Sequence, residues 1–311
     1  MQAIRVHHFG GLDSLVREDV PRPAPGDGDV LLRVKAAGVG PWDALVRSGQ
    51  SVLPQPLPLT LGSDVSGLIE QVGAGVSQFR PGDAVFGATN ARFTGGYAEY
   101  AVASATKLAK MPGRLGFIEA ASVPVVACTA WQMVFDYGEI DATKRVLVHG
   151  AAGNVGAYAV QLAKRVAHDV VATAFSDDVA YVQTLGADRV IDVQKLRFEE
   201  VLTDVDVVLD TIGGDRQHRS FAVLKPRWRS GLGRNRAGSG ASCSPRRTAL
   251  FFLVEVSSQR LEQVAALIEG GELTTNVGDV LPLSSARLAH EMLAGKPHKR
   301  GKIVLTVDGS Q

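Results

Sequence analysis

The heptapeptide Gly150-Ala151-Ala152-Gly153-Asn154-Val155-Gly156 follows the apolar run Arg145–His149 and opens a segment with helical spacing, Gly156–Arg165. A strand, a glycine-rich turn and a helix in this order are the fingerprint of a dinucleotide site. Pyrophosphate binds backbone N–H groups at a helix N-terminus, and a side chain in the turn would block its approach. The alternative is a turn that binds no ligand. The residues predicted to bind the coenzyme here are Ala151 (where the standard motif has its first glycine), Gly153, Asn154, Val155 and Gly156.

The chain after this turn alternates between extended and helical segments. Asp169–Ala174, Arg189–Ile191 and Val205–Leu209 are short apolar runs typical of buried strands, and Val179–Leu185 has helical spacing. Such alternation predicts βαβ crossovers and a parallel sheet covered on both faces. The predicted fold class is therefore α/β with a doubly wound parallel sheet.

The first third of the chain has a different pattern. Met1–His8, Val30–Ala37 and Val65–Val72 are β-branched or apolar runs, and glycine turns separate them from the shorter runs Ala84–Phe86 and Tyr97–Val102. Short strands at close spacing predict a small barrel or sandwich. Two patterns in 311 residues agree with the usual size of about 150 residues per domain.

Composition excludes several classes of function. Lys and Arg (33) balance Asp and Glu (32), so the net charge of +1 provides no field for nucleic acid or an acidic membrane. Two cysteines are too few for a disulfide framework or a four-cysteine zinc lobe. The apolar stretch 120–135 is shorter than the ~20 residues of a membrane helix, and the N-terminus has no apolar core of signal-peptide length. We expect a cytoplasmic protein without a nucleic-acid or membrane partner.

The end of the second strand of the predicted sheet selects the coenzyme. An acid there, roughly 20 residues past the glycines, would bind the adenosine ribose and repel a 2′-phosphate. Ala174 stands at that position and Ser176 offers a hydroxyl, which favours NADPH. Asp177 and Asp178 follow at once and argue against this preference, unless Asp177 serves as a helix N-cap.

Further motifs extend over most of the chain: AGVGPWD (37–43), LGSDVSG (61–67), VGAGV (72–76), PGDAV (81–85), GGYAEY (95–100), TAW (129–131), LGAD (185–188), VLDTIGG (208–214) and GKIVL (301–305). With the glycine turn, they resemble the medium-chain dehydrogenase/reductase superfamily, specifically its zinc-independent quinone oxidoreductase branch. The match runs to about Leu224 and resumes at about Phe251. The resemblance implies a GroES-like catalytic domain (1–123), a Rossmann dinucleotide-binding domain (124–256) and a C-terminal return to the catalytic domain (257–311).

The resemblance also bears on metal binding. Zinc-dependent relatives present Cys, His or carboxylate ligands from the catalytic domain. Gly40 stands at the cysteine position and Ser63 at the histidine position, while Cys128 lies off the spacing of a third ligand and is expected to be a small buried residue. We therefore expect no metal site. Without a Lewis acid to lower the pKa of an alcohol, alcohol dehydrogenation is disfavoured.

Two threonines are implied at the nicotinamide. The family places the residue at Thr129 against the nicotinamide, and Thr211 borders the same side; the alternative for Thr129 is an N-cap hydroxyl at the start of a helix. Relatives often have Asn at the position of Gly40 and Tyr at that of Leu45, with roles near nicotinamide or substrate, and neither side chain exists here.

The proton donor and catalytic residue are consequently unknown from the sequence. Asp43 and Tyr97 are candidates, and Arg47 is a third. Each has a structural alternative: Asp43 as a helix cap, Tyr97 as a packing residue, and Arg47 as a solvated or ion-paired surface residue.

Residues 226–248, PRWRSGLGRNRAGSGASCSPRRT, interrupt the pattern with six arginines and no acid. The family has an apolar strand here, the fifth of its sheet. The leading interpretation is a pair of compensating reading-frame shifts in a GC-rich gene; an exposed loop and a basic clamp for phosphate or nucleic acid are alternatives. Phe251–Val256 follows and is expected at the sheet edge, which in the family pairs with a second copy and predicts a homodimer.

Taken as a whole, the sequence predicts an NADPH-dependent, zinc-independent oxidoreductase that transfers a hydride to a small-molecule electron acceptor of the quinone type. The carbonyl of such an acceptor already polarises it, so the protein mainly supplies position and a dry pocket. An enal or enone double-bond reductase, and an NADPH-binding protein with little catalytic activity, are the alternatives.

Overall fold

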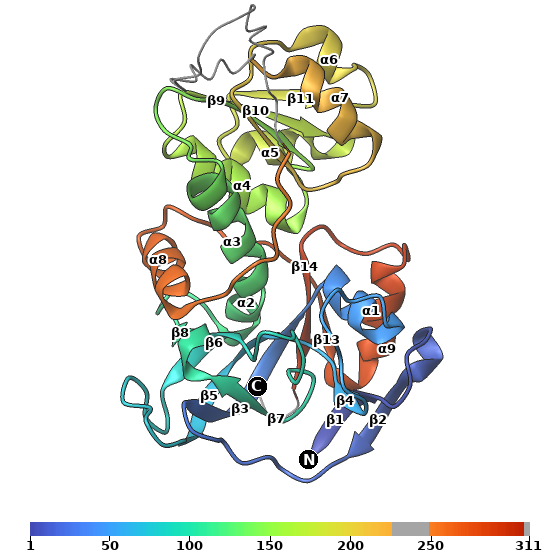
Figure 1. Cartoon of the computed structure of the whole chain (residues 1–311), viewed down its shortest axis with the longest axis vertical. Helices are drawn as coiled ribbons and strands as arrows, with labels where there is room; N and C mark the ends of the chain where they lie inside the picture. Colours follow the sequence, from blue (N-terminus) through green and yellow to red (C-terminus); the bar gives the residue numbers. More distant parts are fainter. Residues whose placement is uncertain (226–248, 308–311) are drawn as a thin grey trace, which may run out of the picture. The chain divides into compact units, whose positions relative to one another are not determined.

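A computed structural model describes residues 1–225 and 249–307 (Figure 1). The chain forms two compact units, Met1–Thr129 with Val254–Gln311, and Ala130–Leu253. The chain thus leaves the first unit after residue 129 and returns at residue 254, where the sequence predicted 123/124 and 256/257. The segment 226–248, and with it every interpretation of that segment, lies outside the described residues.

The first unit is built around a seven-stranded sheet in the order β13-β14-β3-β5-β6-β8, with β7 also paired to β3. The antiparallel β3–β5 ladder shifts register between Leu31 and Leu32 and again between Val34 and Ala36. A second sheet has the order β2-β1-β4. The strands are β1 (Gln2–Val6), β2 (Leu15–Asp19), β3 (Asp29–Val39), β4 (Leu59–Thr60), β5 (Asp64–Val72), β6 (Ala84–Ala88), β7 (Tyr100–Ser104), β8 (Leu108–Lys110), β13 (Val277–Pro282) and β14 (Lys302–Thr306).

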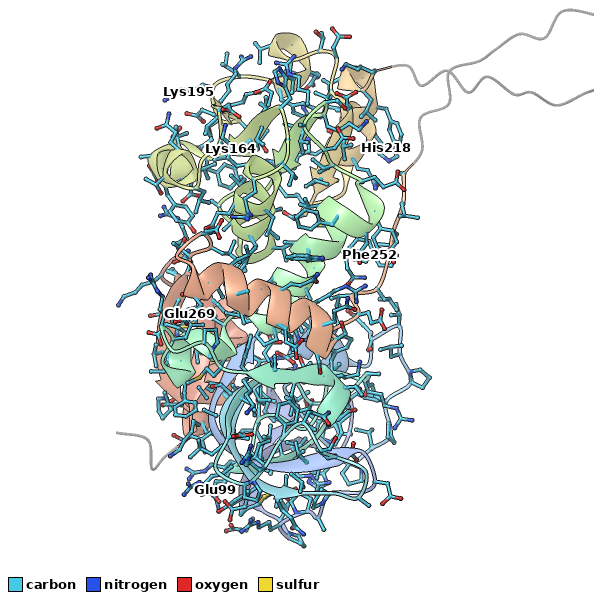
Figure 2. All side chains as sticks on the ribbon, turned by 90° about the vertical axis from the view of Figure 1, so that its left-hand side faces the viewer. Glu99, Lys164, Lys195, His218, Phe252 and Glu269 are labelled. Carbon is cyan, nitrogen blue, oxygen red and sulfur yellow. The ribbon has the colours of Figure 1, made fainter. Side chains whose placement is uncertain are left out.

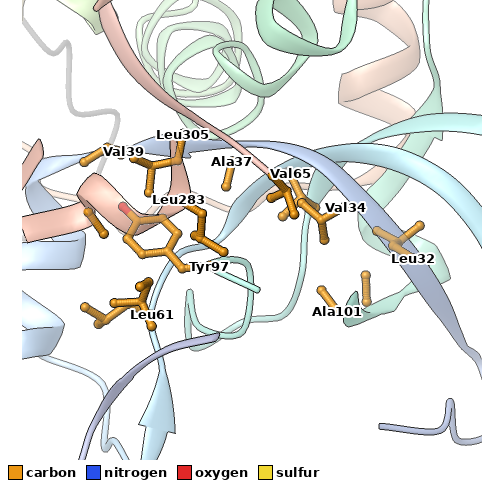
Figure 3. Close-up of a cluster of buried hydrophobic side chains, with 14 of the residues drawn as sticks. Leu32, Val34, Ala37, Val39, Leu61, Val65, Tyr97, Ala101, Leu283 and Leu305 are labelled. Atoms are coloured by element: carbon orange, nitrogen blue, oxygen red, sulfur yellow. The ribbon is translucent and has the colours of Figure 1, made fainter. Parts of the chain in front are cut away.

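The core of the first unit comes from alternate positions of these strands. Leu32 and Val34 of β3, Val65 of β5 and Leu305 of β14 belong to one buried cluster, which also includes the ring of Tyr97 (Figure 3). Because strand side chains alternate between faces, this period-2 pattern gives each strand one buried side. The β-rich architecture predicted for the first third is confirmed.

Five α-helices complete the described part of the first unit. The helix α1 starts with a proline at its first position, where no N–H is needed, and ends at Gly49 in the left-handed region (φ +76°). The helix α8 starts at an N-cap, Ser257, whose hydroxyl accepts from the N–H of Arg260. The five are α1 (Pro41–Ser48), α2 (Phe117–Ala121), α3 (Pro124–Trp131, whose last two residues belong to the second unit), α8 (Ser258–Glu269) and α9 (Ala286–Leu293).

The second unit contains a parallel sheet in the order β11-β10-β9-β12 (Figure 1). All three strand pairings are parallel, which confirms the predicted βαβ crossovers. A π-helical segment, η3 (Gln132–Tyr137), precedes the sheet. The elements are β9 (Arg145–His149), α4 (Asn154–Lys164), β10 (Asp169–Ala174), α5 (Val179–Thr184), β11 (Arg189–Asp192), α6 (Phe198–Val201), β12 (Val207–Asp210) and α7 (Asp215–Val223).

Two observations concern the outer edge beside β12. The N–H of Val205 donates to the carbonyl of Val223 (2.9 Å) and the N–H of Lys225 donates to the carbonyl of Val205 (2.8 Å), so Val205 and Leu224 form an isolated parallel bridge. The strand predicted at Phe251–Val256 is wrong, because residues 249–257 carry no strand and Phe251 is 84% exposed.

None of the helices in the described part has the length and apolarity to cross a membrane.

Candidate active site

The glycine turn joins β9 to α4 in the predicted order. Its first residue, Gly150, has a φ of +69°, and Gly153 occupies the N-cap position of α4. The first N–H groups of a helix have no acceptor within it and lie at the positive end of the helix dipole. The N–H groups of Asn154, Val155 and Gly156 therefore face the turn as anion-binding donors.

The glycines of the turn have different spatial roles. A Cβ at Gly156 would lie 2.7 Å from the carbonyl carbon of Gly150, so only glycine lets α4 pack this closely on the turn. A Cβ at Gly153 would lie 3.2 Å from the carbonyl oxygen of Gly150, a tight contact, and would meet no other atom of the described residues beyond its chain neighbours. Close packing at Gly156 and a small residue at the N-cap are what a pyrophosphate at this turn requires.

Hydrogen bonds of Thr211 and His149 hold the glycine turn in place. The hydroxyl of Thr211 donates to the carbonyl of His149 (2.8 Å). The His149 ring is hydrogen-bonded to the hydroxyls of Thr173 (2.9 Å) and Ser220 (3.0 Å). Burial lowers the pKa of His149 to about 4, so the ring is neutral. His149 was not predicted as a functional residue. Its only signal in the sequence is that it is a polar residue at the end of an apolar run.

Ser176 already uses both of its donors. Its hydroxyl donates to Oδ2 of Asp192 (2.6 Å) and its N–H donates to Oε1 of Gln194 (2.9 Å). The hydrogen bond from Ser176 lowers the pKa of Asp192. Lys195 (Figure 2) places Nζ 3.0 Å from the same Oδ2. The sequence predicted Ser176 at this position. It did not predict Asp192, the last residue of the neighbouring strand β11, or Lys195, three residues further along the chain.

A second cation lies near this end of β10. The guanidinium of Arg216, from α7, lies 5.8 Å from the ring centroid of Phe175, the residue before Ser176. The interpretation of Asp177 as a helix N-cap is wrong, because Asp178 precedes α5 and no side-chain capping bond forms there.

In the first unit, Thr129 lies inside α3. Its hydroxyl donates to the carbonyl of Val125 one turn earlier (2.7 Å). The N-cap alternative is therefore wrong. Thr129 keeps some exposure while most of its neighbours in α3 are buried. The N–H of Val125 donates to Oδ1 of Asp64 (3.1 Å), which ties α3 to the start of β5.

Asp64 also belongs to a buried ion pair that the sequence did not reveal. Nζ of Lys302 lies 2.9 Å from Oδ2 of Asp64, and the two side chains are 1% and 0% exposed. The same Nζ lies 4.1 Å from the ring centroid of Trp42, and the indole N–H of Trp42 donates to the hydroxyl of Ser63 (3.1 Å). We call Trp42, Ser63, Asp64 and Lys302 the indole cluster.

The structure brings the two catalytic candidates together. Oδ2 of Asp43 accepts from the N–H of Gly40 (2.8 Å) and from the hydroxyl of Tyr97 (2.9 Å). Both side chains are fully buried, Tyr97 within the apolar core (Figure 3). Burial raises the pKa of Asp43 to about 7, against the lowering effect of these hydrogen bonds. The geometry fits a helix cap and a packing residue.

Arg47 differs from the expectation for it. Its Nη1 lies 3.1 Å from Nδ1 of His290, which is 1% exposed. Burial lowers the pKa of His290 to about 4, so this ring is a neutral acceptor. Arg47 is half-buried, and its side chain is hydrogen-bonded to this neutral ring.

Comparison with known proteins assigns the chain to a family that has this two-domain fold. Residues 26–113 match the model of the alcohol dehydrogenase GroES-like domain, and residues 185–305 match that of the zinc-binding dehydrogenase family. A quinone oxidoreductase from Lama guanicoe is 33% identical, with 98% of this chain and 97% of that protein covered. The chain belongs to the medium-chain dehydrogenase/reductase superfamily, in its quinone oxidoreductase-like branch.

Solved structures of this superfamily agree over the whole chain. The quinone oxidoreductase from Coxiella burnetii superposes with a TM-score of 0.86 at 30% identity, covering 99% of both chains. A mycobacterial protein complexed with NADPH superposes with a TM-score of 0.80 at 30% identity, covering 98% of this chain and 100% of that one. The predicted fold class and the assignment as an oxidoreductase are confirmed.

Proposed function

We propose that this member of the superfamily is an NADPH-dependent, zinc-independent oxidoreductase that transfers a hydride to a quinone-like acceptor. The observation that carries the proposal is the β9–α4 turn, where the first N–H groups of α4 have no acceptor within the helix and glycine stands at both Gly153 and Gly156. The relatives named quinone oxidoreductase support the acceptor, and the NADPH complex of a structural relative supports the coenzyme.

The residues of the turn fit the coenzyme. The N–H groups of residues 154–156 would hold the pyrophosphate, and Ala151, whose own N–H donates to the carbonyl of Thr173 (3.3 Å), would line its approach. Thr129 and Thr211 would border the nicotinamide in their respective units. Bound NADPH supplies a hydride, and a proton from solvent completes the conversion of a quinone to a hydroquinone. Because Asp43 and Tyr97 are fully buried, we assign neither of them the role of proton donor.

Residue chemistry supports zinc independence. Gly40 has no side chain, and the hydroxyl of Ser63 is engaged by Trp42. Zinc binds a thiolate, whereas burial raises the pKa of the Cys128 thiol to about 12. Within residues 1–225 and 249–307, no three His, Cys, Asp or Glu side chains are grouped to hold a metal ion.

The choice of NADPH over NADH depends on a balance of charges at Ser176. Lys195 and Arg216 would attract a 2′-phosphate, and Asp192 would repel it. Ser176 would have to turn its hydroxyl from Asp192 toward the phosphate. The positive groups and the absence of an acid at Ala174 support NADPH.

Fluorescence titration with NADPH and NADH, followed by an acceptor screen, tests the proposal. We expect tighter binding of NADPH and its steady oxidation by a small quinone, without loss of rate in EDTA. Faster turnover of an unsaturated aldehyde would make the protein an enal reductase. Tight binding without turnover of any acceptor would make it a coenzyme-binding protein, and indifference to both coenzymes would contradict the proposal.

We also propose that the protein is a homodimer. Leu250, Phe251 and Leu253 are 62%, 84% and 49% exposed, a run of apolar surface that a second copy would cover. A monomer by light scattering would contradict this.

A further inference from the structure

Trp42 occupies the space that a side chain at residue 40 would need. A Cβ built on Gly40 would lie 2.5 Å from Cε2 of the Trp42 ring. The backbone of Gly40 (φ −134°, ψ 162°) is an extended conformation that any residue adopts. Glycine is therefore required here by the indole and not by the backbone.

The indole is fixed on two sides. Its N–H donates to the buried hydroxyl of Ser63 (3.1 Å), and Nζ of Lys302 lies 4.1 Å from the ring centroid. Lys302 is itself held by Asp64 in the buried ion pair. A ring with both a hydrogen bond and a cation contact loses little freedom on binding a ligand, so it is pre-organised.

Part of Trp42 nevertheless remains accessible, whereas Ser63, Asp64 and Lys302 are buried. Nζ of Lys302 and the backbone of Gly40 lie against the ring, and the part of Trp42 that stays exposed is available to a ligand. Asp64 continues the network to Val125, whose carbonyl accepts from Thr129. Trp42 is therefore linked to Thr129, which the proposed function places beside the nicotinamide, through its cation contact with Lys302, the Lys302–Asp64 ion pair and the backbone of Val125.

We propose that Trp42 is the specificity-determining residue of the acceptor site: its fixed indole selects planar, ring-conjugated acceptors such as naphthoquinones over small open-chain enals. The inference rests on the proposed function and names its substrate class. Offset stacking of two aromatic systems contributes enough to change selectivity roughly 2- to 10-fold. An open-chain enal offers no ring to stack and gains little from the indole.

The first test measures binding without turnover. Menadione, a naphthoquinone that accepts electrons from excited indole, is titrated into the wild type and into Trp42→Phe while tryptophan fluorescence is recorded. Trp131 and Trp228 remain in both proteins. We expect saturable quenching in the wild type and its loss in the variant. Equal saturable quenching in both proteins, or none in the wild type, would overturn the inference.

The second test measures selectivity. The ratio of kcat/KM for menadione to kcat/KM for crotonaldehyde should fall roughly 2- to 10-fold in Trp42→Val and be largely retained in Trp42→Phe, which keeps a ring. An unchanged ratio in Trp42→Val would contradict the inference. If the wild type turns over neither acceptor, the proposed function fails, and the quenching result still decides whether a quinone contacts Trp42.

The third test examines the space itself. Gly40→Ala should lower Tm and shift tryptophan emission in the wild type, because the new methyl displaces the indole, but should leave Tm unchanged in a Trp42→Val background. An equal loss in both backgrounds would show that something other than Trp42 fills this space. Trp42→Tyr replaces Trp42→Val if the latter does not fold.

Discussion

Glycines do opposite things at two places in this molecule. At the β9–α4 turn, a Cβ on Gly153 would meet only the carbonyl oxygen of Gly150 (3.2 Å), and no side chain covers the helix N–H groups there, which have no acceptor in the helix. In the first unit, the spaces beside Gly40 and Gly62 are filled by the rings of Trp42 and Tyr97; a Cβ on Gly62 would lie 2.9 Å from Cγ of Tyr97. The first place is uncovered by side chains, and the second is filled by aromatic rings.

The difference separates binding from stability. An open turn with free donors stabilises the fold little but can hold an anion. A closed cluster of buried charges and rings must have every partner in place, because an unpaired buried charge is costly. Substitutions in the closed region should therefore change unfolding, and substitutions in the open region should change coenzyme binding.

The largest effect should come from breaking the buried ion pair of the closed region. Lys302→Met leaves the carboxylate of Asp64 buried with the N–H of Val125 as its remaining donor. We expect a loss of about 3–5 kcal/mol in the free energy of unfolding, measured by urea titration. Arg287→Met is the matched control, because its pair with Asp13 is exposed (54% and 91%) and should contribute little. Similar losses in both variants would remove the distinction between closed and exposed pairs.

The next effect concerns the pH dependence of the closed region. The pKa of Asp43 rises from 3.8 to about 7 in the folded protein, so folding favours its protonated form. This contribution is complete below about pH 4 and is lost as the pH rises through 7. Each pH unit between the two pKa values contributes about 1.4 kcal/mol, so the free energy of unfolding of the wild type should fall by up to about 4 kcal/mol over this range.

Asp43→Asn removes the titration while still accepting from Gly40 and Tyr97. Urea titrations at pH 5 and pH 8 should show a smaller difference for this variant than for the wild type. Asp27→Asn, at an exposed loop position, should behave as the wild type does. A slope in Asp43→Asn as steep as in the wild type would assign the pH dependence to other groups.

How well the sequence predicted each region follows from the range of its contacts. The strand Arg145–His149, the glycine turn and the start of α4 adjoin in the chain, so period and turn chemistry identified them. The pair Asp64–Lys302 spans 238 residues and Tyr97–Asp43 spans 54. No local pattern encodes such contacts, so the sequence could name Asp43 and Tyr97 but not their bond.

Errors in the prediction have the same origin. Thr129 was weighed as an N-cap, but α3 begins five residues earlier, at Pro124. Asp192 was missed because it reaches Ser176 across the sheet from β11. An apolar composition predicted a strand at Phe251–Val256, where the described chain forms none. Pairing partners decide whether an apolar run becomes a strand, and composition alone does not supply them.

A smaller effect should distinguish the two glycines of the open region, Gly153 and Gly156. Gly156→Ala places a methyl against the backbone of Gly150 and should lose about 1–3 kcal/mol of stability together with coenzyme binding. In Gly153→Ala the methyl would lie 3.2 Å from the carbonyl oxygen of Gly150, which a shift of a few tenths of an ångström relieves, so this variant should lose less stability than Gly156→Ala. Its NADPH affinity should nevertheless fall roughly tenfold, because the methyl occupies the path of the pyrophosphate. Unchanged NADPH affinity in Gly153→Ala would show that the open space is not the coenzyme site.

The smallest effect should come from one charge at the edge of the open region. In Asp192→Asn, the amide oxygen can still accept from the hydroxyl of Ser176, but Lys195 loses its counter-charge and becomes available to a 2′-phosphate. A charge near the surface is worth about 1 kcal/mol, so the ratio of NADPH to NADH affinity should rise roughly 5-fold in a fluorescence titration. Asp141→Asn, exposed in the same unit, should leave the ratio unchanged. If Asp192→Asn instead favours NADH, Asp192 orients Ser176 toward the phosphate more than it repels it, and the preference for NADPH arises from hydrogen-bond geometry rather than from net charge.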